Sequence, residues 1–159
     1  IVPRHLIARS GQTPPSEKLA TAHIGVGGQG GGNLGEIGSF SETEVVALCD
    51  IDENNLNAAA SKFPKARPHR DWRRLLDSHK DVDAVVVSTP DHHHAPIALA
   101  AMQLGKHAYV EKPLSHTIEE ARKMQEMAAR MKVVTQMGNN GHAGEGLRLW
   151  KEYIYAGAI

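Results

Sequence analysis

The sequence predicts an α/β fold with a doubly wound parallel sheet, and three observations support this prediction. Short apolar runs rich in Val and Ala alternate with stretches of helical periodicity from about residue 19 onward. Near-continuous apolar strands of this kind are typical of parallel sheets that helices cover on both faces. A glycine-rich turn directly follows the first run, and several later helices begin at residues that can cap them. We therefore expect a Rossmann sheet of six parallel strands.

The strands and helices follow from these patterns in chain order. Apolar runs predict strands at 19–26, 44–50, 84–87, 108–110 and 133–135. Helices are expected at 53–62, at 72–77, from about Pro96 to Gly105 and after Thr117. Asp52 and Asp71 can accept hydrogen bonds from the first turns of the first two helices, and Thr117 begins a capping box.

The pattern divides the chain into three segments. Residues 1–18 hold three prolines without sustained periodicity, which predicts an extended arm. Residues 19–141 contain the alternating strands and helices and form the expected nucleotide-binding domain. Residues 142–159 predict a helix that leads toward a further domain.

The composition of the 159 residues excludes several classes of function. Lys and Arg together number 18, as do Asp and Glu, so the chain lacks the positive charge of a nucleic-acid binder. No polybasic run suggests a lipid surface, and no apolar stretch approaches the roughly 20 residues of a membrane span. Cys49 is the single cysteine, which excludes an internal disulfide framework. These features favour a soluble, disulfide-free domain.

The turn after the first expected strand carries the G-x-G-x-x-G pattern at Gly25, Gly27 and Gly30. In a dinucleotide-binding turn the first glycine permits the tight turn, the second lets the backbone approach a pyrophosphate, and the third lets the helix pack closely. The helix N-terminus then offers unpaired N–H groups to the phosphates. Gly28 and Gln29 lie within the same turn and join the expected cofactor-binding set. The alternative is a glycine-rich surface loop without a ligand.

Asp50 ends the second expected strand, twenty residues after Gly30. A carboxylate at this position accepts hydrogen bonds from an adenosine ribose diol, and Ile51 beside it is expected at the same site. The carboxylate repels a 2′-phosphate, and the next basic residue is Lys62, a helix away. These features favour NAD over NADP as cofactor. Asp50 could instead serve only as a loop or capping acid.

Two later segments, S-T-P-D-H-H-H at 88–94 and G-K-H-A-Y-V-E-K-P at 105–113, carry a family resemblance. With the glycine turn and Asp50, the chain resembles the glucose–fructose oxidoreductase/inositol dehydrogenase family (Gfo/Idh/MocA) from about residue 18 to its end. The tripeptide Glu111-Lys112-Pro113 after a strand is the most specific element of the resemblance.

The resemblance implies roles for individual residues. Lys112 is expected at the nicotinamide and the substrate hydroxyl, Glu111 near the nicotinamide ribose, and Gln136 where the family closes the nicotinamide pocket, at the end of the sixth strand. Further residues are expected to line the cofactor groove: Ser88, Thr89, Pro90 and His94.

A catalytic role for Lys112 also follows from its place in the expected fold. It lies at the carboxyl end of a parallel strand, where doubly wound sheets bind ligands. A cation there stabilises the alkoxide that forms as an alcohol loses its proton, and partial burial would let the amine share that proton. The plainer alternative is a solvated lysine before a rigid turn.

The histidines do not predict a metal site. His92, His93 and His94 are consecutive on a turn and cannot all face one ion, and no cysteine or carboxylate pair lies at a usual ligand spacing. We therefore expect no metal. His142 could face the substrate or be a loop histidine, and it stays unassigned.

The family resemblance also concerns what surrounds this domain. Members continue into a second α/β domain that forms the substrate wall and usually the subunit interface, so a homo-oligomer is expected through that domain. We expect the present chain to lack it and to be nearly inactive alone. Residues 1–18 resemble the segment after a twin-arginine export signal in secreted bacterial members, which favours an exported over a cytoplasmic location.

Three functions remain open from the sequence. The first is a nicotinamide-dependent dehydrogenase that acts on a sugar, cyclitol or related polyol. The second, by resemblance to one branch of the family, is a glycoside hydrolase that works by transient oxidation with tightly held NAD. The third is a non-catalytic dinucleotide sensor.

Overall fold

The computed structural model describes Pro14 and residues 17–159, so most of the predicted arm lies outside the described residues. Six parallel strands form one sheet in the order β3-β2-β1-β4-β5-β6. The strands are β1 (Leu19–Ile24), β2 (Thr43–Cys49), β3 (Arg67–His69), β4 (Ala84–Val87), β5 (His107–Glu111) and β6 (Thr135–Gly138). This is the strand order of dinucleotide-binding Rossmann folds. The predicted fold class is confirmed.

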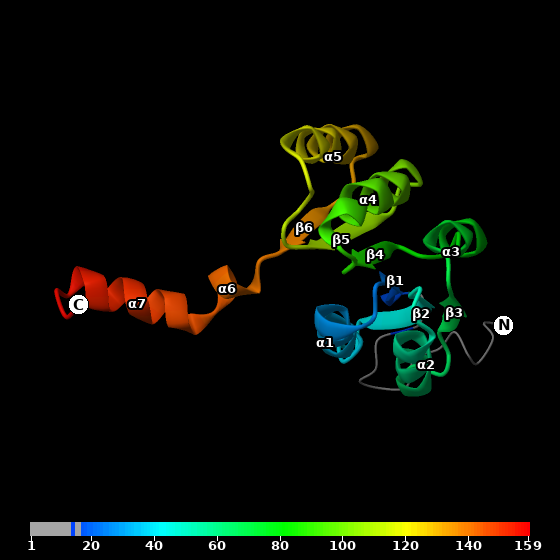
Figure 1. Cartoon of the computed structure of the whole chain (residues 1–159), viewed down its shortest axis with the longest axis horizontal. Coiled ribbons are helices and arrows are strands. Elements are labelled where there is room, and N and C mark those ends of the chain that lie inside the picture. The colour runs from blue at the N-terminus through cyan, green and yellow to red at the C-terminus, as the bar shows by residue number, and fades with distance from the viewer. Residues whose placement is uncertain (1–13, 15–16) are drawn as a thin grey trace.

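Helices connect the strands and cover both faces of the sheet (Figure 1). They are α1 (Gly28–Ile37), α2 (Glu53–Lys62), α3 (Trp72–Ser78), η3 (Asp91–His93), α4 (His94–Gln103), α5 (Ile118–Met131), α6 (Asn140–Ala143) and α7 (Glu145–Tyr155). Helices α3, α4 and α5 cover one face, and α1 and α2 cover the other. Among the described residues, no helix combines the length and the apolar character that a bilayer crossing needs.

Side chains from the two faces form two apolar clusters. On the α4 face, Ile97 and Met102 pack against Val85 of the sheet, and all three are at most 1% exposed. On the α1 face, Leu34 and Leu48 are at most 2% exposed. Full burial of one such side chain contributes about 1.5–3 kcal/mol. These clusters pack the strands against their helices, and the candidate site lies at the carboxyl ends of the strands.

The predicted helix caps are present. Asp52 and Asp71 accept hydrogen bonds from the backbone N–H groups of Asn54 and Arg73, at 2.8 and 2.9 Å. Thr117 completes the capping box of α5. Capping satisfies donors that the first helical turn leaves without an intrahelical partner.

Two strands differ from the prediction. β3 was not predicted, because three residues with a central proline, Pro68, give no strand signal, and an edge strand tolerates a missing N–H. The last strand begins two residues later than expected. The N–H of Val133 bonds to the carbonyl of Ala128 at the end of α5, and Val134 is 70% exposed. Gln136 is therefore the second residue of β6 and not its end.

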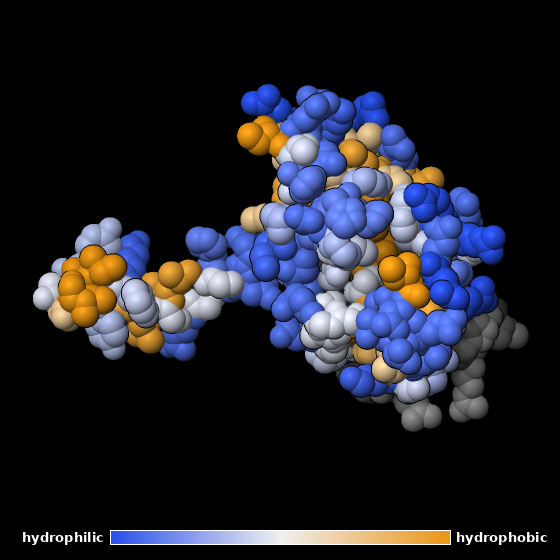
Figure 2. All heavy atoms as spheres, in the orientation of Figure 1, coloured by the Kyte–Doolittle hydropathy of each residue, from blue (hydrophilic) through white to orange (hydrophobic). Residues whose placement is uncertain are grey.

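Helix α7 lies apart from the sheet and its covering helices (Figures 1 and 2). It has no buried residues, and its large apolar side chains, among them Trp150 and Ile154, are exposed. The prediction of a helix in residues 142–159 agrees with α7, while the short helix α6 separates it from β6.

Candidate functional site

The glycine turn lies at the carboxyl end of β1, between β2 and β4, where the direction of strand succession reverses. Gly25 has φ +83°, and a Cβ there would lie 2.6 Å from the carbonyl oxygen of Ser88. A Cβ on Gly30 would contact the carbonyl oxygen of Gly25. Both glycines are thus required by the close approach of β1, α1 and β4. The turn has the geometry that the fingerprint predicts.

Asp50 fixes the other side of this turn. One carboxylate oxygen accepts from the N–H of Val26 at 2.9 Å, and the other accepts from the N–H of Asp52 at 2.9 Å. Each oxygen keeps a further lone pair. The carboxylate is half-buried and faces the turn with acceptor capacity to spare, as a ribose diol requires.

A hollow of about 700 Å³ opens at the tips of β1, β2 and β4, and we call it the switch-point hollow. Seven of the predicted cofactor-binding residues line it: Gly25, Gly27, Asp50, Ile51, Ser88, Thr89 and Pro90. The hydroxyl of Thr89 is buried and has no hydrogen-bond partner within the described residues. An unpaired buried hydroxyl is unfavourable unless a ligand completes it.

Two arginines, Arg70 and Arg73, also line the switch-point hollow. Arg70 follows β3, which pairs with β2, and its guanidinium donates to the carboxylate of Glu53 at 2.7 Å. Lys62 is the next basic residue after Asp50 in the sequence, but Arg70 and Arg73 are the basic residues that line the hollow of Asp50. The unpredicted edge strand β3 brings Arg70 to the rim, and Arg73 lies in the first turn of α3.

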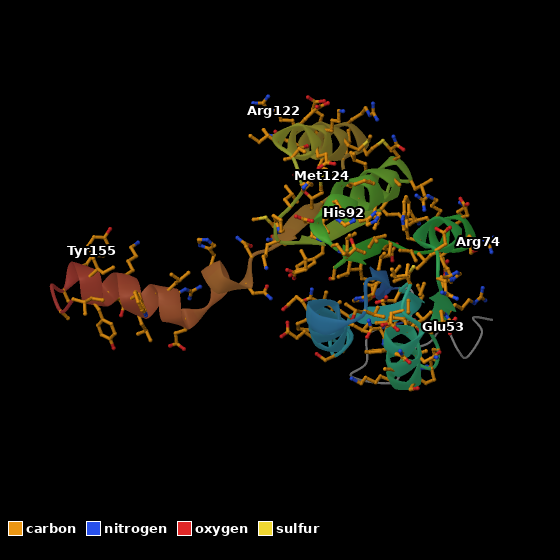
Figure 3. The ribbon with its side chains drawn as sticks, viewed as in Figure 1. Glu53, Arg74, His92, Arg122, Met124 and Tyr155 are labelled. Atoms are coloured by element: carbon orange, nitrogen blue, oxygen red, sulfur yellow. The ribbon has the colours of Figure 1, made fainter. Side chains whose placement is uncertain are left out.

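The elements on the two faces of the sheet meet at this rim. Figure 3 labels Glu53 at the start of α2 and His92 beside α4, which cover opposite faces. His92 and His93 are exposed and line the same hollow. No cluster of three or more His, Cys, Asp or Glu side chains suited to a metal occurs in Pro14 or residues 17–159.

A second hollow, of about 600 Å³, contains Lys112, and we call it the Lys112 hollow. Gln29, Asn139 and His142 are among its polar lining residues. The side chain of Lys112 is exposed, so the predicted partial burial is not found. The sequence left His142 unassigned, and the structure brings it to the hollow of Lys112.

Glu111 lies beneath Lys112 as a buried carboxylate, 5% exposed. One oxygen accepts from the amide of Asn33 at 2.8 Å and from the Tyr109 hydroxyl at 3.4 Å, and the other accepts from the N–H of Lys112 at 3.1 Å. A Cβ on Gly138 would meet this carboxylate. The sequence did not predict the roles of Asn33, Tyr109 and Gly138, because they are separated in the chain and only the packing of α1 and the register of β5 and β6 bring them together.

The local electrostatics favour fixed protonation states. Burial raises the pKa of Tyr109, and the negative charge of Glu111 and the hydrogen bond to it raise that pKa further. Tyr109 therefore stays a hydrogen-bond donor. Burial raises the pKa of Cys49 to about 12, helped by the charges of Asp50 and Asp71. The raised pKa disfavours the thiolate form of Cys49.

Two predicted site residues lie elsewhere. His94 does not line either hollow, because its ring is inserted beneath the turn and is 1% exposed. Gln136 is exposed on β6, and its amide donates to the carbonyl of Met137 at 2.7 Å. Gln136 lines neither hollow, because the strand starts later than the apolar run suggested.

The residues of the two hollows fit a dinucleotide. The N-terminus of α1 lies between them, since Gly27 lines the switch-point hollow and Gln29 lines the Lys112 hollow. Helix N-termini favour phosphate, Asp50 offers a ribose acceptor, and Thr89 offers a free buried hydroxyl. An extended dinucleotide can therefore place its adenosine in the first hollow and its other half beside Lys112.

Comparisons with known proteins agree with this geometry. Residues 19–139 match the family described as Gfo/Idh/MocA, "Oxidoreductase family, NAD-binding Rossmann fold". The levoglucosan dehydrogenase of Pseudarthrobacter phenanthrenivorans is 38% identical over 101 residues, which are 64% of this chain and 26% of the relative. A glycosyl hydrolase family 109 protein of Shewanella putrefaciens is 32% identical over 140 residues, which are 82% of this chain and 30% of the relative. The chain thus spans less than a third of the length of these curated relatives.

A solved structure shows the same architecture. The WlbA dehydrogenase from Bordetella pertussis, crystallised in complex with NADH and UDP-GlcNAcA, superposes with a TM-score of 0.77 at 26% sequence identity. The superposition covers 89% of this chain and 40% of WlbA.

Proposed function

Because the chain belongs to the Gfo/Idh/MocA family of oxidoreductases with an NAD-binding Rossmann fold, we propose that it binds NAD(H) across the two hollows. We further propose that the enzyme carrying this domain transfers hydride between the nicotinamide and a hydroxyl of a sugar, cyclitol or related polyol. One observation carries the proposal: the glycine turn has Asp50 on one side and Lys112 on the other, each at a hollow.

On the adenosine side, the carboxylate of Asp50 accepts hydrogen bonds from the ribose hydroxyls, and the N-terminus of α1 binds the pyrophosphate. Thr89 supplies a hydroxyl that has no other described partner. The carboxylate of Asp50 disfavours a 2′-phosphate. The two arginines at the hollow that could bind one are each paired with a carboxylate, Arg70 with Glu53 and Arg73 with Asp71. The carboxylate of Asp50 therefore supports NAD over NADP.

On the other side, Lys112 acts on the substrate hydroxyl. The bound nicotinamide supplies the hydride acceptor. Lys112 donates a hydrogen bond to the hydroxyl oxygen and stabilises the negative charge that develops there. The hydroxyl proton passes to a base in the same hollow, a role for which His142 is the candidate. Glu111 does not touch the reacting atoms in this role; it positions Lys112 by accepting its backbone N–H. Asn139 and His142 supply polar groups that can orient a polyol in the same hollow.

The relatives named as glycosyl hydrolase family 109 proteins support a second candidate. A glycoside hydrolase that uses NAD for transient oxidation would release sugar without net conversion of NAD. Assays that follow NADH absorbance and sugar release together separate the two activities. The presence of Lys112 at its hollow disfavours the third candidate, a non-catalytic sensor.

The structure offers its own reporter for cofactor binding, because Trp72 lines the switch-point hollow. In a Trp150→Phe background, which removes the second tryptophan, NADH titration should change the fluorescence of Trp72. Adding Asp50→Ala should weaken binding tenfold or more, since a hydrogen bond to a charged group contributes about 1.5–3 kcal/mol. Asp77→Ala, an exposed carboxylate on α3 that lines neither hollow, is the matched control.

The same preparation tests turnover. Lys112 is exposed, so this chain excludes little water from the reacting centre, and we expect NADH binding with turnover of sugars near background. Absence of NADH binding by the parent chain, or equal binding by Asp50→Ala, would contradict the proposed site.

A further inference from the structure

The imidazole of His94 lies between two carbonyl oxygens that belong to different turns. Its Nδ1 is 2.6 Å from the carbonyl oxygen of Pro113, and its Nε2 is 2.6 Å from that of Thr89. The residue is 1% exposed. Water therefore has almost no access to either ring nitrogen.

This arrangement constrains the protons on the ring. A carbonyl oxygen only accepts hydrogen bonds, so each of the two contacts requires an N–H on the imidazole. A neutral imidazole carries one N–H and presents a lone pair at its other nitrogen. Either neutral tautomer would leave one lone pair facing a carbonyl oxygen at 2.6 Å in a buried place. The doubly protonated ring satisfies both contacts.

Two features of the site disfavour a positive charge on the His94 ring. The side chain is buried, and His94 is the first residue of α4, where the helix dipole disfavours positive charge. Charge-assisted hydrogen bonds to both carbonyls act in the opposite direction, and they are shorter and stronger than neutral ones. Both distances, 2.6 Å, are shorter than the roughly 2.7–3.2 Å of ordinary N–H···O hydrogen bonds, which is the direction that charge assistance favours.

We propose that His94 is an imidazolium whose two N–H groups tie the turn of Thr89 to the turn of Pro113, which makes it a positioning residue for Lys112. Thr89 lines the switch-point hollow and Pro113 lines the Lys112 hollow. One ring therefore sets the spacing between the two halves of the groove. Pro113 directly follows Lys112, so loss of the bond to Pro113 displaces the lysine. The consequence for Lys112 rests on the proposed function, whereas the charge of the ring does not.

The neighbouring histidines do not share this role. His92 and His93 are exposed at the rim of the switch-point hollow. Only the third histidine of the run, where α4 begins, has its ring beneath the turn. His94 was expected to line the groove, whereas its buried ring supports the groove from below in this proposal.

The charge is measured directly on the 159-residue chain. A long-range ¹H–¹⁵N spectrum of the ¹⁵N-labelled protein near neutral pH reports each histidine ring nitrogen as protonated or not. We expect both nitrogens of His94 to be protonated, with cross-peaks that disappear in His94→Gln. One unprotonated nitrogen would overturn the proposal. Sequential assignment identifies the ring in the parent chain even if the variant does not fold.

The positioning role has its own readout. In His94→Gln, the backbone amide signals of Lys112 and Leu114 should shift and NADH affinity should fall several-fold. His116→Gln, an exposed histidine in the loop that follows Pro113, is the matched control and should leave both unchanged. Unmoved Lys112 signals in a folded His94→Gln variant would overturn the positioning role. A doubly protonated ring in a chain that binds no NADH would instead contradict the proposed function alone.

Discussion

A methyl group added at Gly30 should reveal how closely α1 must approach β1. A Cβ at Gly30 would contact the carbonyl oxygen of Gly25 and lie 2.9 Å from the Cβ of Ser88. The obstructing groups are backbone and a short side chain, so neither can turn away. Gly32 lies in the same helix with nothing within 4 Å of its Cβ position. The two substitutions therefore share the change in helix propensity and differ in the clash.

The expected energies have opposite signs. Replacement of a helical glycine by alanine contributes about 0.8–1 kcal/mol of stability at either site. Overpacking at Gly30 costs about 3 kcal/mol, the upper part of the usual range, which leaves a net loss of about 2 kcal/mol. For a chain of this length, Gly30→Ala should lower Tm by about 4–8 °C, and Gly32→Ala should raise it by about 2–4 °C.

Thermal unfolding followed by circular dichroism measures both variants, and NADH titration shows whether the displaced turn weakens cofactor binding. We expect weaker binding only in Gly30→Ala. If Gly30→Ala and Gly32→Ala had the same melting temperature, above that of the parent chain, the close packing of α1 against the turn would be refuted.

Three further predictions concern the cofactor and the core. Asp50→Ser combined with Ile51→Arg should weaken NAD⁺ and strengthen NADP⁺ binding, because repulsion of the 2′-phosphate is removed and a partner is supplied; an unchanged affinity ratio by calorimetry contradicts the ribose assignment. Glu53→Gln should release Arg70 and raise NADP⁺ affinity several-fold at unchanged NAD⁺ affinity and stability, since an exposed ion pair contributes only about 0–1 kcal/mol; no gain in calorimetry would exclude Arg70 from the site. Burial lowers the pKa of His23 from 6.5 to about 4, so below pH 6.5 protonation favours the unfolded chain. The free energy of unfolding should therefore be highest above pH 6.5 and should decrease by about 3 kcal/mol as the pH falls toward 4. The melting temperature of His23→Val should decrease less than that of the parent chain across this pH range. An equal decrease would contradict the lowered pKa of His23.

The sequence predicted the features that local patterns determine. The apolar runs and capping residues predicted five of the six strands and the central helices, and the comparisons confirm the family that the motifs indicated. The glycine turn was also predictable, because each glycine meets a requirement of the strand–helix turn itself. Asp50 followed from its fixed position at the end of the second strand.

The features that the sequence did not predict depend on register and on side-chain direction. Arg70 reaches the rim only because β3 adds to the sheet edge, and three residues around a proline carry no strand signal. Gln136 was misplaced because the apolar residues before β6 serve the connection from α5. His94 was expected to line the cofactor groove, but its ring is buried beneath the turn, and no sequence pattern distinguishes an inward ring from the two exposed ones before it.

The environment of Glu111 shows how these separate elements act on one lysine. Asn33 approaches the carboxylate from α1, Tyr109 from the same strand, and Gly138 leaves the space on β6 that the carboxylate fills. A carboxylate with three described donors is held in one place. It can therefore fix the N–H of Lys112, as His94 fixes the carbonyl of Pro113 from the opposite turn. Lys112 is exposed and its long side chain is free to move, so its position in the hollow depends on these two anchors of its backbone rather than on packing of the side chain itself.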